Sequence, residues 1–235
     1  MRGASLPVAL ALIVAWLATF VPAALPALAV GSWPAAWRHH WALGVPALES
    51  SLVLALGWLI VGMLLRALPG AAHAWRSLAI LALAVLGVRF TWLVGAAGNA
   101  EIAGALLALC LWPAAERLSE VALARLGLVA AAAAVVALPL LAMPHLRGVH
   151  WLPFTDLAPL AQGARHVFWI GALVVLATGA GARALLGGLA VALGLAAVEG
   201  LRALGSAEYA TATDPAIALV VALALLLFAR LRGAR

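Results

Sequence analysis

Lysine is absent from this sequence of 235 residues, tyrosine and cysteine occur once each, and charged residues make up only 9% of the chain. The single cysteine, Cys110, excludes an internal disulfide and a thiolate metal cluster. All fourteen basic residues are arginines that are scattered without a basic stripe, so the net charge of +6 does not indicate nucleic-acid binding. No serine, cysteine or threonine nucleophile stands beside a predicted base, which favours a protein that is not an enzyme.

Apolar residues are present in great excess instead. They form 67% of the sequence, and the mean hydropathy is +1.17, more than a soluble core requires. Apolar runs of about 18 residues or more are typical of membrane-spanning helices. We predict an all-α, polytopic integral membrane protein with about eight transmembrane helices, at residues 5–29, 48–68, 77–97, 100–115, 124–143, 163–181, 183–204 and 213–231. The first run is longer than the apolar part of a signal peptide, so we expect a retained helix.

The distribution of arginine predicts the orientation of these spans. Nine arginines fall at the two termini or in the loops after the second, fourth and sixth spans: Arg2, Arg66, Arg76, Arg117, Arg125, Arg183, Arg230, Arg232 and Arg235. Four fall on the opposite side: Arg38, Arg147, Arg165 and Arg202. Because basic residues are retained on the cytoplasmic side, we expect both termini in the cytoplasm of a bacterial inner (plasma) membrane.

The two halves of the sequence resemble each other. A His-Trp pair followed by a proline-containing loop and an apolar span begins at His40 and again at His150. Arg89 precedes Glu101 by twelve residues, and Arg202 precedes Asp214 by twelve. Four spans in each half indicate a parallel repeat, with halves at residues 1–118 and 119–235; chance similarity in an Ala/Leu-rich chain is the alternative.

The segment "SWPAAWRHHW" at 32–41 predicts a helix that lies in the membrane interface. Trp33, Trp37 and Trp41 are four residues apart and therefore share one helical face. Tryptophans at headgroup depth anchor such helices, and we assign the same role to Trp151.

Ionisable residues inside or at the ends of apolar spans are the candidate polar site. Arg89, Glu199 and Arg202 lie within spans, where charge is costly, and Glu199 and Arg202 are close enough on one helix to pair. Glu101 and Asp214 each open a helix, where a carboxylate caps free N–H groups. These five residues either bind a polar ligand or form structural ion pairs and caps.

Histidines gather in the outer loops and offer another candidate site. His39, His40, His145 and His150 are potential ligands of a metal, a haem or a magnesium-porphyrin pigment. No His-Glu-X-X-His and no Cys-X-X-Cys-His motif supports such a group. We therefore predict no cofactor and keep these ligands as the alternative.

The second half contains "HWLPFTDL" at 150–157 and "LAVALGLAAVEGLRALGSAEYATATDPAIALVVALALLL" after it. This pattern resembles the VanZ-like membrane proteins, in which a Pro-Phe entry precedes a span, a helix ends in Glu-X-X-Gln, and a loop with Arg and Asp leads into a small-residue helix. Pro153, Phe154, Glu199 and Asp214 match the pattern. Arg202 stands where the glutamine is expected, and Glu208 or Tyr209 where the loop arginine is expected. The resemblance covers residues 148–232, with a degenerate echo at 40–112.

The resemblance implies a bacterial cell-envelope protein, related through the founding member of the family to glycopeptide (teicoplanin) resistance, whose biochemical activity is unsettled. On that basis we expect a protein that binds, acts on or shields a lipid-linked ligand. Two alternatives remain: a non-catalytic accessory subunit of a larger membrane complex, associated with pigment or redox groups, and a transporter, which rests on the repeat alone. The expected partners are membrane lipids and other membrane subunits, and not nucleic acid.

Overall fold

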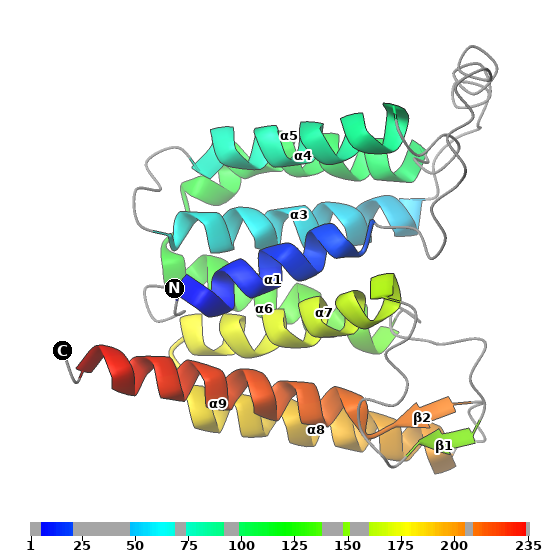
Figure 1. Cartoon of the computed structure of the whole chain (residues 1–235), viewed down its shortest axis with the longest axis vertical. Helices are drawn as coiled ribbons and strands as arrows, with labels where there is room; N and C mark the ends of the chain where they lie inside the picture. Colours follow the sequence, from blue (N-terminus) through cyan, green and yellow to red (C-terminus); the bar gives the residue numbers. More distant parts are fainter. Residues whose placement is uncertain are drawn as a thin grey trace. The chain divides into compact units, whose positions relative to one another are not determined.

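The computed structural model describes residues 6–20, 48–68, 74–91, 99–137, 148–150, 160–204 and 209–233. Within these ranges the protein is all-α, with eight helices and two strands of three residues each (Figure 1). The chain divides into two compact units, one of residues 1–19 and 119–235 and the other of residues 20–118. The first helix therefore belongs to the unit formed by the second part of the chain, although the expected first half, 1–118, contains it.

The unit of residues 1–19 and 119–235 contains five helices and both strands. In chain order these are α1 (Leu6–Ala18), α6 (Glu120–Ala137), β1 (Gly148–His150), α7 (Leu160–Gly179), α8 (Ala184–Leu204), β2 (Tyr209–Thr211) and α9 (Thr213–Gly233). Helix α1 ends at Ala18, earlier than residue 29. The Thr19 hydroxyl donates to the carbonyl of Trp16 at 2.6 Å, which closes the last turn.

Helix α7 is the centre of this unit, because it packs against α1, α6, α8 and α9. Every described residue from Phe168 to Ala177 is buried. The ring of Trp16 from α1 lies against Phe168, with ring centroids 4.6 Å apart, and meets the edge of Trp169 at 6.3 Å. Aromatic pairs at these distances stabilise a core beyond the area they bury.

Local sequence signals set two of the helix boundaries. The Ser119 hydroxyl accepts a hydrogen bond from the Ala122 amide at 3.2 Å and so caps the start of α6. Helix α7 ends at Gly179, and Gly181 just beyond it has a φ of +111°, which suits glycine because L side chains crowd there. The Ala182 amide donates to the Ala177 carbonyl and the Gly181 amide to that of Thr178, both at 3.1 Å, which is the Schellman pattern.

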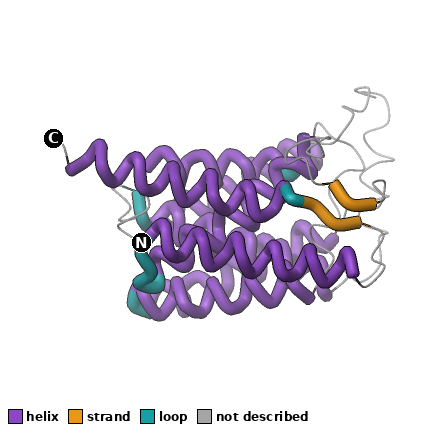
Figure 2. The backbone as a smooth tube through the Cα atoms, turned by 90° about the horizontal axis from the view of Figure 1, so that it is seen from below, coloured by secondary structure: helices purple, strands orange, loops and turns teal. Residues whose placement is uncertain are grey.

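Helices α8 and α9 pack closely side by side (Figures 1 and 2). Gly188 of α8 faces Ala222 of α9, and a Cβ atom on Gly188 would overlap the Cβ of Ala222. The small residues therefore set how closely the two helices approach, as is common between membrane helices.

The two strands were not expected from the sequence. Strands β1 and β2 pair in parallel, with Gly148 opposite Tyr209, Val149 opposite Ala210 and His150 opposite Thr211. Both segments are expected in loops from the sequence, because each strand is too short to show an alternating pattern. The pairing holds β2 beside the end of α8, against which it packs (Figure 1).

The described part of the unit of residues 20–118 contains α3 (Leu48–Arg66), α4 (Ala74–Thr91) and α5 (Asn99–Glu116), each packed against the other two. The rings of Phe20 and Trp58 stack with centroids 5.8 Å apart. Trp112 is fully buried and lies over Gly62, where a larger side chain would overlap its ring.

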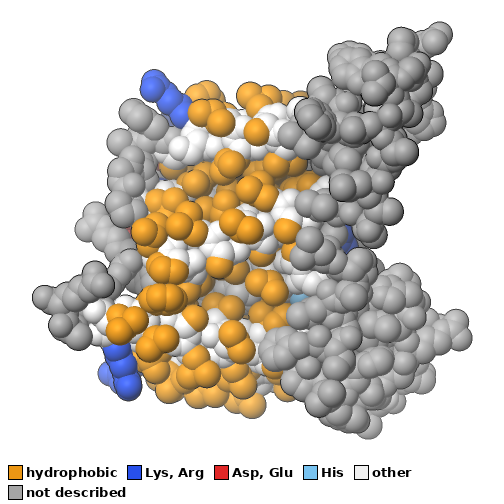
Figure 3. All heavy atoms as spheres, in the orientation of Figure 1, with side chains coloured by type: hydrophobic (Ala, Val, Ile, Leu, Met, Phe, Trp, Pro, Cys, Tyr) orange, Lys and Arg blue, Asp and Glu red, His pale blue; other side chains and the backbone are white. Residues whose placement is uncertain are grey.

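Helices occur in all eight segments that the sequence predicts as spans. Among the described helices, α8 and α9 are long and apolar enough to cross a membrane, over Ala184–Leu201 and Thr213–Leu231. Only 28% of the residues in each of these windows are buried, whereas the core helix of a soluble protein is mostly buried. Hydrophobic side chains cover much of the described helical surface (Figure 3), and on α8 and α9 they include the exposed Leu193, Leu223 and Leu227.

Candidate functional site

Glu199 lies near the end of α8 and is only 6% exposed. Its Oε2 accepts a hydrogen bond from the backbone amide of Thr211 at 2.9 Å. A buried carboxylate is strongly unfavourable unless hydrogen bonds replace its hydration. The bond offsets part of that cost and fixes β2 against α8.

Thr211 continues the polar contacts from β2 into α9. Its hydroxyl oxygen accepts a hydrogen bond from the Thr213 amide at 3.0 Å, and both threonines are buried. The first amides of a helix have no partner within the helix. Thr211 therefore satisfies one of the amides at the start of α9.

Asp214 follows in the first turn of α9 and is 1% exposed. A carboxylate in this place is stabilised by the positive end of the helix dipole. Its Oδ1 lies 2.7 Å from Nδ1 of His166, which is 0% exposed and comes from the first half of α7. A distance of 2.7 Å is typical of a charge-assisted hydrogen bond.

The second ring nitrogen of His166, Nε2, differs from Nδ1 in having no hydrogen-bond partner among the described residues, although it is buried. Leaving a buried polar atom unsatisfied costs about 1–3 kcal/mol, so an atom of this kind in a native protein often marks a function. Among the buried side-chain atoms of this site, this nitrogen is the one that faces no described donor or acceptor.

We call Glu199, Thr211, Asp214 and His166 the polar cluster. It joins α7, α8, β2 and α9 at the end of the unit where the strands lie (Figures 1 and 2). The structure thus brings the predicted residues Glu199 and Asp214 into one connected region.

The other predicted polar residues do not enter the described cluster. Arg202 is in α8, three residues beyond Glu199, and its side chain lies outside the described part of the structure. Arg89 and Glu101 belong to the other compact unit, of residues 20–118. Glu101 stands in the first turn of α5, as expected for a carboxylate that opens a helix, and the Arg89 side chain lies outside the described residues.

The interfacial segment and most of the candidate histidines fall outside the described residues. These are Trp33, Trp37, Trp41, Trp151, His39, His40 and His145. His150 is in β1, opposite Thr211 of β2. Within the described ranges, no group of three or more His, Cys, Asp or Glu residues is placed to hold a metal ion.

His166 is not among the histidines that the sequence predicts as candidate ligands. A signal was nevertheless present: His166 lies six residues after the start of α7, between the apolar Ala164 and Phe168. The ionisable-residue criterion that selects Glu199 would select it too.

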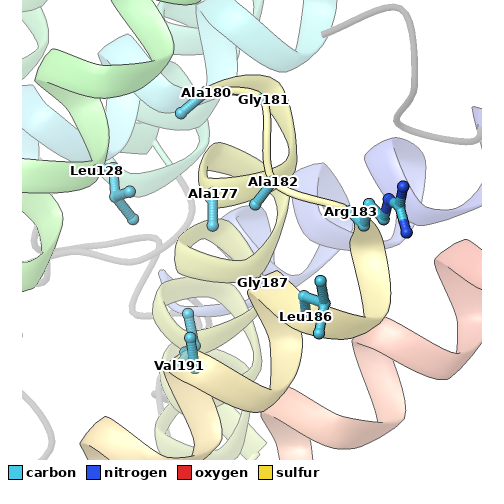
Figure 4. Close-up of a pocket in the computed structure, with 10 residues that line it drawn as sticks. Leu128, Ala177, Ala180, Gly181, Ala182, Arg183, Leu186, Gly187 and Val191 are labelled. Atoms are coloured by element: carbon cyan, nitrogen blue, oxygen red, sulfur yellow. The ribbon is translucent and has the colours of Figure 1, made fainter.

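A second feature of the same unit is an apolar groove beside the turn between α7 and α8 (Figure 4). It has a volume of about 630 Å³ and is open to the surroundings. It lies at the start of α8, whereas Glu199 lies near the end of that helix. The residues lining it are Leu128, Ala177, Ala180, Gly181, Ala182, Arg183, Leu186, Gly187, Ala190 and Val191. Small side chains produce the groove, and it holds a single charged residue, so it offers no chemistry comparable to the polar cluster.

The chain matches no protein-family model, no curated protein and no solved structure. The similarity to VanZ-like proteins therefore remains a prediction that rests on the residues quoted for it.

Proposed function

We propose that the protein is a VanZ-like polytopic protein of a bacterial inner membrane, with eight spans and both termini in the cytoplasm. The apolar composition, the helices in all eight expected segments and the exposed apolar faces of α8 and α9 support this topology. The arginine distribution supports the orientation. In that orientation the polar cluster lies at the outer, non-cytoplasmic end of α7, α8 and α9.

We further propose that the polar cluster binds the headgroup of a lipid-linked ligand, and that the protein is a binding protein. The observation that carries this proposal is the buried His166–Asp214 pair, with one histidine nitrogen left without a described partner. Four buried polar side chains at the end of highly apolar helices are costly, and ionisable groups at such positions are functional candidates. A headgroup at this depth would have its acyl chains beside the exposed leucines of α8 and α9.

Lipid-dependent stabilisation of the purified full-length protein tests the proposal. The protein is placed in phosphatidylcholine nanodiscs that contain phosphatidylglycerol, glucosyl diacylglycerol or phosphatidylethanolamine, and its Tm is measured. A ligand that binds only the folded state raises the Tm. We expect at least one of these lipids to do so in the wild type, and Glu199→Gln to reduce the rise.

Glu116→Gln is the matched control, because Glu116 is an exposed carboxylate at the end of α5. It should leave the lipid response unchanged. No rise in Tm with any of the lipids, or an equal rise in all three proteins, would refute headgroup binding at the polar cluster. Co-purification of a stoichiometric membrane partner in place of a lipid response would support the accessory-subunit alternative.

A further inference from the structure

One ring nitrogen of His166, Nδ1, is hydrogen-bonded to Asp214, and the other, Nε2, has no described partner. Asp214 stands in the first turn of α9, and its Oδ1 lies 2.7 Å from Nδ1 of His166. A carboxylate accepts hydrogen bonds and does not donate them, so we assign Nδ1 as the donor of this bond. In a neutral imidazole whose Nδ1 carries the proton, Nε2 is the acceptor.

The other residues of the polar cluster have hydrogen-bond partners. Glu199 Oε2 accepts from Thr211, and the Thr211 hydroxyl oxygen accepts from Thr213. Nε2 of His166 is the polar-cluster atom that is fully buried and has no described partner. A ligand that enters the site therefore meets this nitrogen as a preformed, oriented hydrogen-bond acceptor.

The hydrogen-bonding state of Nε2 selects the class of ligand. A nitrogen that accepts a hydrogen bond needs a partner that carries a proton, such as a hydroxyl. A fully ionised phosphate oxygen carries no proton and only accepts hydrogen bonds. The Asp214 carboxylate at the other side of the ring adds a negative charge, which also disfavours a second anion there.

We infer that Nε2 of His166 accepts a hydrogen bond from a hydroxyl of the ligand headgroup, so that the polar cluster recognises a sugar or glycerol headgroup rather than a bare phosphate. This inference rests on the proposed function, since it names the ligand class of the same site. His166 is then a binding residue, and Asp214 positions it by holding Nδ1.

Two substitutions at one position separate binding from structure. His166→Asn places an amide N–H near the position of Nδ1, keeps the bond to Asp214 and removes Nε2. His166→Gln places its amide near the position of Nε2, where its oxygen can accept the ligand's proton. The Tm of both variants in pure phosphatidylcholine nanodiscs, whose headgroup has no hydrogen-bond donor, reports whether the fold is intact.

The affinity for glucosyl diacylglycerol is obtained by titrating it into these nanodiscs and following the Tm. We expect His166→Asn to bind about tenfold more weakly than the wild type, which corresponds to one lost hydrogen bond with its partner left unpaired. His166→Gln should recover part of the affinity. In the wild type labelled with ¹⁵N-histidine, the Nε2 resonance that disappears in His166→Asn should shift when the glucosyl lipid is added.

Phosphatidic acid and phosphatidylethanolamine complete the experiment, because their headgroups offer an anion and an ammonium group. A preference for either of them, or unchanged glucosyl-lipid affinity in His166→Asn, would overturn the hydroxyl assignment. In that case headgroup binding at the polar cluster still stands if Glu199→Gln reduces the rise in Tm that a lipid causes. If Glu199→Gln leaves the rise unchanged for every lipid, the proposed function fails together with the inference.

Discussion

Asp214 has two structural roles at the scale of a single residue. It stands in the positive first turn of α9, and it accepts the hydrogen bond from Nδ1 of His166 on α7. Its position in "TATDP" is readable from the sequence, because a carboxylate before a first-turn proline is typical of a helix start. Its partner is not readable, because His166 is 48 residues away.

Asp214→Ala should lower the free energy of unfolding by about 2–4 kcal/mol, because it leaves Nδ1 of His166 buried without an acceptor and removes the charge at the helix start. Denaturation in mixed detergent micelles, followed by circular dichroism, measures the change. Glu116→Ala serves as the control, since the exposed Glu116 should change stability by no more than about 0.5 kcal/mol. Equal unfolding curves for the two variants would contradict the structural role of the pair.

At the scale of a secondary-structure element, α8 and α9 show that the sequence predicts where a helix lies but not which of its faces makes a contact. Both helices are readable from their apolar runs, and both begin and end within a few residues of their expected positions. The face by which they meet depends on Gly188 against Ala222. The sequence of α8 contains several glycines, and nothing in it indicates which of them contacts α9. The packing of the two helices determines that it is Gly188.

Gly188→Ala should destabilise the protein by about 1–3 kcal/mol, because the added Cβ overlaps Ala222 and forces α8 and α9 apart. Gly194→Ala in the same helix is the matched control: a Cβ there meets nothing within 4 Å. Since alanine favours helix over glycine by about 1 kcal/mol, the control should be neutral or stabilising. Thermal unfolding in one detergent compares the two, and a destabilised Gly194→Ala with an unchanged Gly188→Ala would contradict the packing.

At the scale of the whole molecule, the proposed function depends on the orientation in the membrane. The polar cluster lies where α8 ends and α9 begins, so the side on which this connection lies would decide which leaflet supplies the proposed ligand. Nine arginines fall on the predicted side of the two termini, and four fall on the opposite side, which includes the connection between α8 and α9. Since basic residues are retained in the cytoplasm, the sequence favours the outer side for this connection.

Labelling of single cysteines in intact cells checks this orientation. The natural Cys110 is first replaced by alanine, and then Ser119 or Ser206 is changed to cysteine. A membrane-impermeant maleimide should label Ser206→Cys, which lies in the connection between α8 and α9, and spare Ser119→Cys between α5 and α6. Permeabilised cells provide the control, in which both should react. The reverse pattern would place the polar cluster on the cytoplasmic side.

The sequence by itself determined the helices and the approximate place of two carboxylates of the polar cluster. Apolar runs of membrane-spanning length and helix-start residues are local signals, and Glu199 and Asp214 stand out because charge is rare in such runs. Only the tertiary structure decided that α1 joins the unit of residues 119–235, that β1 pairs with β2, and that His166 meets Asp214. In spans that are apolar on every side, the periodic pattern that would mark an inward face is weak. The rotation of each helix, and therefore the partner of each polar side chain, is fixed by packing between distant segments.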